Sequence, residues 1–281
     1  MERNYGGSLS GGPRMSYSLS FMKLPDAYAW CRAVVARSGT NFGVAIRLLP
    51  KAKRDAICAI YAHCRIADDI ADGGADRSLL TDEHLRLALD DVRATWRVPR
   101  EHLDAIVDGC TMDLEKHRYA SFDELVEYCK KVASAVGLAC LHVFGFEEKK
   151  ALAYAEELGI AMQLTNIIRD VKEDAARGRI YLPAEELKRF GVSERDVLDG
   201  RFTPAMKAML AFQVARARAW FTKGRRLLPL VHADSRKCPA AIATVYEALL
   251  DRVEASGHDV FTKRVRLTAA QKLKVLASAL K

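Results

Sequence analysis

The chain has 281 residues, of which 50% are hydrophobic, so it is long enough for one large domain with a sizeable core. Its formal net charge is +8, but the basic residues are spread along the chain and form no nucleic-acid-binding motif. We therefore expect no nucleic acid partner. The seven cysteines include no Cys-x-x-Cys pair, which favours reduced core thiols in a cytoplasmic protein.

The N-terminal residues 1–20 are polar and rich in glycine and serine, and we expect a flexible segment there without a signal peptide. Residues 21–281 contain no linker or internal repeat, so we expect a single folded domain. No run reaches the roughly 18 to 20 apolar residues that span a bilayer. Any contact with the inner face of a membrane would therefore be peripheral.

Apolar residues recur at helical spacing through most of the chain, and no convincing strand alternation occurs. The expected helices cover 26–37, 42–49, 51–72, 81–97, 101–117, 121–144, 147–176, 203–228, 239–256 and 268–280. Gly73-Gly74 is a typical end for the third helix, and Ser121 is a typical N-cap for the sixth. The pattern predicts an all-α fold, a single-domain helical bundle around a central cavity.

The expected helix 51–72 carries a polar strip with two carboxylates. Tyr61, Arg65, Asp68 and Asp72 share one face, within about 60° at 100° per residue. The order along this face is an aromatic residue, a cation and then two acids one turn apart. Such a face could hold a cation together with an anion.

A second polar strip lies on the expected helix 147–176. Gln163, Asn166, Asp170 and Asp174 fall within roughly 80° of one face. Apolar residues flank the strip, so it borders buried surface, and Arg169 lies close by. Oxygen ligands on successive turns suit Mg²⁺, which is typically bound by one or two carboxylates, waters and substrate phosphates. Two such helices facing each other would form a pocket for a diphosphate carried on Mg²⁺.

Other interpretations of the acidic strips are weaker. A solvated face is the plain alternative, since like charges one turn apart cost only about a few tenths of a kcal/mol. Two strips that each carry an arginine within an apolar run seldom arise by chance. An EF-hand fails because Ile70 and Leu79 occupy ligand positions. A di-iron bundle fails because the chain has no Glu-x-x-His.

The break at 175–183, directly after the second strip, is rich in arginine and glycine. We hypothesise that it is a mobile flap over the diphosphate, with Arg179 and Tyr181 as phosphate or hydroxyl contacts. An exposed basic loop is the alternative. Asp113 could add charge near the pocket, but a solvated face explains it at least as well. Small residues within 133–137 would let a ligand or a neighbouring helix approach closely.

These residues and spacings resemble the squalene/phytoene synthase family of head-to-head prenyl transferases, from about residue 26 to 275. The two family signatures correspond here to 61–72 and to 163–174, the latter followed by Gly-Arg-Ile-Tyr-Leu-Pro at 178–183. Further matches are 38–42, 48–50, Tyr128 with 132–137, Tyr246 and Arg264. One departure is Asn41 before Phe42, where many relatives have a small hydroxyl residue.

The resemblance implies that residues 21–281 are the catalytic domain of a transferase that joins two prenyl diphosphates with Mg²⁺. The implied catalytic residues are Asp68, Asp72, Asp170, Asp174 and Tyr181. The implied metal ligands are Asp68, Asp72, Asn166, Asp170 and Asp174. The implied substrate-binding residues are Phe42, Tyr61, Arg65, Tyr128, Gln163, Asn166, Arg169, Arg179, Tyr246 and Arg264.

The product expected first is presqualene diphosphate or squalene from two farnesyl diphosphates, because the chain most resembles the bacterial presqualene diphosphate synthases of hopanoid biosynthesis. Phytoene from two geranylgeranyl diphosphates is the alternative, since phytoene synthases share these motifs. NADPH is not favoured, because no G-x-G-x-x-G fingerprint occurs. A head-to-tail transferase or terpene cyclase would have a second DDxxD motif or an Asn/Ser/Glu triad on the second helix, and the second strip has neither. A non-catalytic module of the same fold is disfavoured because both acidic strips are intact.

Overall fold

The computed structural model describes residues 23–37, 42–268, 270–272, 274 and 277. The first helices are α1 (Leu24–Arg37), α2 (Phe42–Ile46), α3 (Lys51–Ala71), α4 (Glu83–Trp96), α5 (Arg100–Glu115), α6 (Phe122–Cys129) and α7 (Ala135–Phe144). They are followed by α8 (Lys150–Ala176), α9 (Ala184–Phe190), α10 (Glu194–Leu198), α11 (Pro204–Gly224) and α12 (Lys237–Ala255). Two short 3₁₀ segments, η1 (Arg77–Thr81) and η3 (Arg225–Leu230), and one π-helical segment, η2 (Lys130–Ser134), complete the order.

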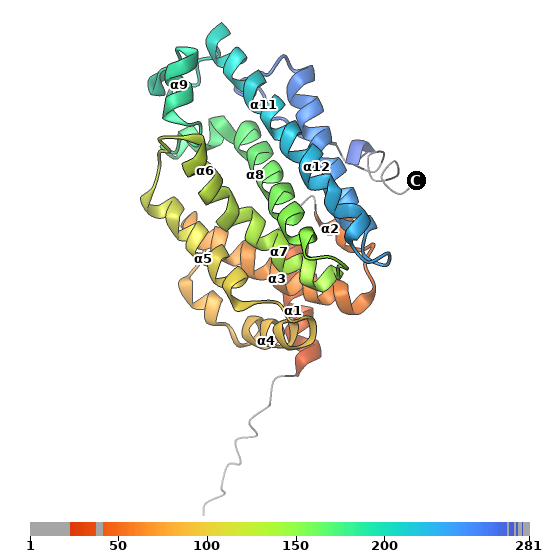
Figure 1. The fold of residues 1–281 in the computed structure, drawn as a ribbon. Coiled ribbons are helices and arrows are strands. Elements are labelled where there is room, and N and C mark those ends of the chain that lie inside the picture. Colours follow the sequence, from red (N-terminus) through yellow and green to blue (C-terminus); the bar gives the residue numbers. More distant parts are fainter. Residues whose placement is uncertain (1–22, 38–41, 269, 273, 275–276, 278–281) are drawn as a thin grey trace, which may run out of the picture.

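The described residues form no β-strand, and their β-type pairing is confined to the isolated bridges Arg118–Ile180 and Phe146–Val231. The expected all-α bundle is therefore confirmed (Figure 1). No helix in the described part combines the length and apolarity needed to cross a bilayer. The flexible segment expected at 1–20 lies outside the described residues, as does much of the helix expected at 268–280.

Two stretches differ from expectation. The helix expected over 121–144 contains η2, a π-helical turn that joins α6 to α7. Helices α9 and α10 were not expected, because segments of seven and five residues are too short to show a helical period. The sequence does hold one signal for α10, since Ser193 and Asp196 form a capping box at its start.

Helix α8 occupies the middle of the bundle and packs against α11, α7 and η2 (Figure 1). Glycines allow these close contacts. A Cβ atom on Gly159 would lie 2.6 Å from Ser134 Cα, and one on Gly224 would lie 2.6 Å from the backbone nitrogen of Leu158. On the other side of η2, a Cβ on Gly109 of α5 would lie 2.7 Å from a methyl group of Val132. The π-helical turn is thus held tightly between α5 and α8.

The buried Lys53 fixes the start of α3. Its ammonium group donates hydrogen bonds to the carbonyl of Phe144 at 2.8 Å, to Asp234 at 2.9 Å and to Ser235 at 2.9 Å. A buried charge is stable only when it is paired and hydrogen-bonded in this way. The contacts tie the beginning of α3 to the end of α7 and to the turn that precedes α12.

The cysteines are free thiols, as expected for reduced core positions. Those buried are Cys31, Cys58, Cys129 and Cys238. Burial raises the pKa of the Cys58 thiol to about 11, so this group is protonated at neutral pH. Cys64 and Cys140 are partly buried and line the cavity described below.

Candidate active site

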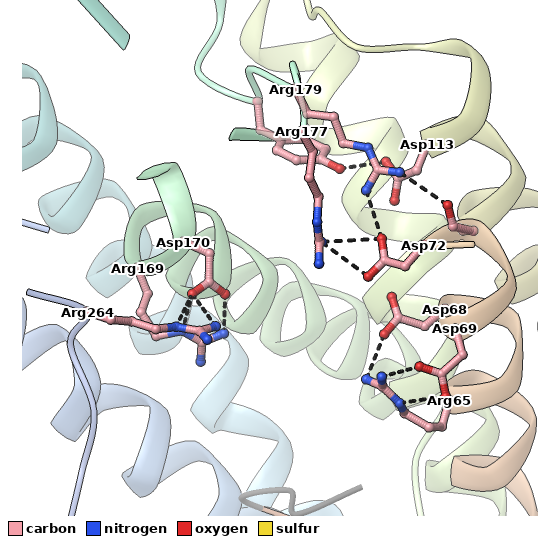
Figure 2. A network of polar contacts seen from close by, with 12 residues as sticks. Arg65, Asp68, Asp69, Asp72, Asp113, Arg169, Asp170, Arg177, Arg179 and Arg264 are labelled. Carbon is pink, nitrogen blue, oxygen red and sulfur yellow. Dashed lines mark hydrogen bonds and ion pairs between the residues drawn. The ribbon is translucent and has the colours of Figure 1, made fainter. Parts of the chain in front are cut away.

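The acidic strip of α3 lies at the C-terminal end of this helix. Arg65 donates to Asp68 at 3.0 Å and to Asp69 at 3.1 Å (Figure 2). Asp72 is the residue that caps the helix. Asp69, which is not part of the predicted strip, thus takes part in fixing the guanidinium of Arg65.

Asp72 is paired with the segment that follows α8. Its carboxylate lies 3.2 Å from Arg177 and 3.1 Å from Arg179 (Figure 2). Arg179 also donates to the carbonyl of Ala71 at 3.4 Å. The structure therefore brings the end of α3 and the loop after α8 together, as the flap hypothesis requires. Arg177 was not among the expected site residues, because the family resemblance singled out Arg179 and not Arg177.

The acidic strip of α8 is held by a different pair of arginines. Arg169 donates to Asp170 at 2.9 Å, and Arg264 donates to the same carboxylate at 2.8 Å (Figure 2). Arg264 also lies 3.2 Å from Glu173. Burial alone would raise the pKa of Asp170, but the hydrogen bonds and charges of Arg169 and Arg264 outweigh it and lower this pKa.

The other two acids of the strips are less well neutralised, since Asp174 makes no ion pair with a described residue and Asp68 has Arg65 alone. Burial and the nearby charge of Asp170 raise the pKa of Asp174 to about 7, and its carboxylate makes no ion pair with a described residue. Protein atoms surround the Asp68 carboxylate, but its side chain is still 55% exposed to water. Burial raises its pKa to about 6 against the charge of Arg65, and the charge of Asp72 adds to this rise.

The oxygen atoms of this region suit a hard divalent cation as ligands. The Asn166 amide donates to Gln163 at 3.1 Å, while its own buried oxygen has no hydrogen-bond partner among the described residues. Unpaired carboxylate and amide oxygens are the ligands that Mg²⁺ takes. No three described His, Cys, Asp or Glu side chains converge to form a ready-made metal centre. A cation here would have to share its coordination with oxygens of a bound anion.

An apolar cavity of about 230 Å³ opens beside these charges. Its walls come from α2, α3, η2, α7, α8, η3 and α12. Four of the expected substrate-binding residues line it, namely Tyr61, Gln163, Asn166 and Tyr246. Ala133 and Gly137 line it too, so small residues do let a ligand approach at this point, while Ser134 lies in the close contact with α8.

The far end of the cavity is formed by residues remote from the acidic strips. At 1.5 Å per residue, Ile57 lies about 16 Å along α3 from Asp68, and Ala155 lies about 22 Å along α8 from Asp170. Phe144, the last residue of α7, lines the same end, where Lys53 holds its carbonyl. We call the charged region the mouth and the wall around Ile57, Phe144 and Ala155 the floor.

Some expected residues lie elsewhere. Tyr128 and Tyr181 do not line the cavity; both are buried, and their hydroxyl groups donate to Asp113 at 2.9 Å and 2.7 Å. Asp113 is itself buried, so the solvated position considered for it is wrong. The loop after α8 is exposed at 176–178 and buried at 180–183, so the alternative of an exposed basic loop holds for its first part only. The side chain of Phe42 lies outside the described residues, although its backbone begins α2.

Comparisons with known proteins agree with this geometry. The sequence pattern of the squalene/phytoene synthase family matches residues 35–271. Phytoene synthase from Mycobacterium bovis is 36% identical over 281 residues, with 92% of each chain covered. The 15-cis-phytoene synthase from Synechococcus elongatus is 36% identical over 286 residues, covering 91% of this chain and 93% of the relative.

Solved structures point the same way. A dehydrosqualene synthase superposes with a TM-score of 0.85 at 27% identity, covering 92% of this chain and 96% of the other. A squalene synthase from Alicyclobacillus acidocaldarius gives a TM-score of 0.76 at 29% identity, covering 84% of this chain and 96% of the other. From the family match, the relatives and these folds together, the chain belongs to the squalene/phytoene synthase family of head-to-head prenyl transferases.

Proposed function

We propose that this protein joins two prenyl diphosphates head to head, with their diphosphates at the mouth and their isoprenoid chains in the cavity. One observation carries the proposal: carboxylate strips on two helices meet an apolar cavity at the end where Asn166 has an unpaired buried oxygen. Such a site offers cation ligands to a diphosphate and a dry space to its hydrocarbon tail.

The metal expected here is Mg²⁺, held by Asp68, Asp72, Asn166, Asp170 and Asp174. As a Lewis acid it would stabilise the negative charge on the departing diphosphate. The arginines of the mouth would bind further oxygens of the diphosphates, because a guanidinium suits bidentate contact with phosphate. These arginines are Arg65, Arg169, Arg177, Arg179 and Arg264. To reach the substrate they must exchange carboxylate oxygens for phosphate oxygens.

The cavity would protect the allylic cation left after the first C–O bond breaks. Its apolar walls keep out water, which would otherwise capture the cation. The rings of Tyr61 and Tyr246 line this space, and aromatic faces stabilise positive charge. C1 of the first prenyl group then bonds to the double bond of the second, and loss of a proton closes a cyclopropane ring that still carries one diphosphate.

For chain length we propose farnesyl diphosphate, which gives presqualene diphosphate and, after a second ionisation and loss of a proton from the resulting cation, a hydrocarbon with 30 carbons. The two solved neighbours, named for dehydrosqualene and squalene, support this choice. Geranylgeranyl diphosphate is the second candidate, because the curated relatives are named phytoene synthases. The lipid nature of either product favours peripheral contact of a cytoplasmic enzyme with the inner face of the membrane.

Product analysis tests this proposal. Purified protein with Mg²⁺ would receive farnesyl or geranylgeranyl diphosphate, each with and without NADPH, before mass spectrometry. We expect presqualene diphosphate from farnesyl diphosphate without NADPH. Phytoene from the longer substrate would replace the 30-carbon assignment with the 40-carbon one. A head-to-tail or cyclic product, or no turnover of either substrate, would overturn the proposed reaction.

Metal removal tests the role of the mouth. EDTA should abolish turnover, and an excess of Mg²⁺ should restore it, because the departing diphosphate would lose its principal charge stabilisation. The control is the thermal unfolding midpoint in EDTA, which should show that the protein is still folded. Activity that persists after chelation would remove the metal from the mechanism.

A further inference from the structure

Asp113 on α5 connects three separate segments of the chain at a place where the substrate cavity does not reach. Its Oδ1 accepts a hydrogen bond from Tyr181 at 2.7 Å, and its Oδ2 accepts one from Tyr128 at 2.9 Å. Tyr181 lies in the loop after α8, and Tyr128 lies on α6. Both oxygens of one buried carboxylate are thus used to fix tyrosine hydroxyl groups.

The tyrosine rings enclose this carboxylate. The ring centres of Tyr128 and Tyr181 are 5.2 Å apart, with the ring planes inclined at 26°, and the ring centre of Tyr119 lies 5.4 Å from the first and 5.7 Å from the second. All three side chains are buried. Aromatic pairs at these separations favour a fixed arrangement. The cluster therefore holds Tyr181 in one position.

The loop that contains Tyr181 also carries two of the five arginines of the mouth, Arg177 and Arg179. Its backbone is anchored where Ile180 donates to the carbonyl of His117 at 3.0 Å and where Arg118 donates to the carbonyl of Gly178 at 2.6 Å. Arg179 lies between these two anchors and two residues before Tyr181. Its side chain contacts Asp72. Whatever fixes Tyr181 consequently fixes the place from which Arg179 reaches the mouth.

We propose that Asp113 is a positioning residue: by holding Tyr181, it keeps the loop 177–183 closed so that Arg177 and Arg179 stay at the mouth. Asp113 touches neither the cavity nor the proposed metal ligands through a hydrogen bond. Its part in the reaction would rest on the function proposed above. The position of the loop can be measured without that reaction.

Trypsin provides this measurement, since it cleaves after Arg177 and Arg179. In Asp113→Ala and in Tyr181→Phe we expect cleavage after Arg177 and Arg179 to become about ten- to a hundredfold faster, the range for loss of a hydrogen bond to a charged group. Asp113→Asn, which keeps one acceptor oxygen, should fall between Asp113→Ala and the wild type. The matched control is Tyr128→Phe, which removes the other hydrogen bond of Asp113 from a helix and not from the loop. Its cleavage rate should stay near that of the wild type.

Kinetics provide the second measurement. In Asp113→Ala and Tyr181→Phe, KM for the prenyl diphosphate should rise roughly tenfold or more while kcat changes less, because the arginines would bind the diphosphate less well. The double variant should show no further rise, since both changes break the same contact. Asp104→Asn, an exposed change on the same helix, serves as the control with unaltered kinetics.

The outcomes separate the two proposals. Faster cleavage without any wild-type turnover would support the role of Asp113 and overturn the proposed reaction. Turnover with cleavage rates equal to the wild type in both Asp113→Ala and Tyr181→Phe would overturn the role of Asp113 alone. If Asp113→Ala does not fold, Tyr181→Phe decides the question, because it keeps the buried ring and removes only the hydroxyl.

Discussion

The mouth and the floor of the candidate active site are built from different kinds of contact. At the mouth, side chains with full charges sit on successive turns of α3 and α8 and are paired by arginines from two loops. At the floor, apolar side chains from α3, α7 and α8 meet, and a Cβ on Gly137 of α7 would lie 3.4 Å from the carbonyl oxygen of Ala155. A charge change should therefore alter the mouth without altering the fold, whereas a volume change in the wall should alter packing, product size or both.

Asp170→Asn should have the largest effect. It removes a negative charge that the mouth would use to hold the cation, so we expect kcat to fall by about 10²–10³-fold, as for other preorganised charge-stabilising groups. Melting experiments should find the variant folded. Asp90→Asn, an exposed change on α4, is the matched control. Full activity in Asp170→Asn would contradict the assignment of this strip.

Phe144→Ala should change the product more than the rate. Removing the largest side chain of the floor lengthens the cavity, so the ratio of kcat/KM for geranylgeranyl over farnesyl diphosphate should rise by about 10–200-fold, the usual range for changes in an apolar pocket. Phe146→Ala, two residues away and outside the cavity lining, controls for loss of a nearby ring. An unchanged ratio would show that Phe144 does not limit chain length.

Gly159→Ala should weaken packing. The added methyl group would lie 2.6 Å from Ser134 Cα, which cannot move freely because η2 is wedged between α5 and α8. We expect a loss of about 1–3 kcal/mol in the free energy of unfolding. Denaturant titration would measure it, with Gly43→Ala on α2 as a contrasting glycine that has open space around its Cβ. Equal stability of Gly159→Ala and the wild type would show that the contact can relax.

Asp174→Asn should have the smallest effect on the metal-free protein, and in the stabilising direction. The folded-state pKa of Asp174, about 7, lies above its ordinary value of 3.8, so its contribution to stability is fully present below pH 3.8, falls as the pH rises from 3.8 to 7 and is lost above 7. Asparagine stays neutral, so the variant should melt about 2–4 °C or more above the wild type at pH 8, and the difference should shrink steadily as the pH falls from 7 towards 4. A variant less stable than the wild type at pH 8 would refute the strained state of this carboxylate.

The mouth could be predicted from sequence largely because it depends on local geometry. Asp68 and Asp72, or Asp170 and Asp174, fall on one face once a helix is assumed. Asp113 could not be distinguished in this way, because its partners lie 15 and 68 residues away and a lone acid on a helix resembles a solvated one. The resemblance to a family placed Tyr128 and Tyr181 in the site, but their shared carboxylate became apparent only from the fold.

The floor was still less accessible to prediction. Phe144 looks like any apolar residue of a buried helix, and its place in the cavity depends on the anchor that Lys53 gives to the end of α7. The π-helical turn also leaves no signal in the sequence. It lies where two glycines on other helices, Gly109 and Gly159, let those helices pack closely against residues 130–134. Packing among elements decided these features, whereas periodicity within one element decided the helices themselves.

The ends of α3 and α8 carry one more consequence. Asp72 caps α3, and Asp174 lies in the last turn of α8. The peptide dipoles of a helix leave about half a negative charge at its C-terminus. Two such ends would add their fields to those of the carboxylates and strengthen the attraction of the mouth for the cations that a diphosphate carries. Loss of those cations would leave the carboxylates and helix ends opposed to the diphosphate and the arginines alone to hold it, which would link metal departure to product release.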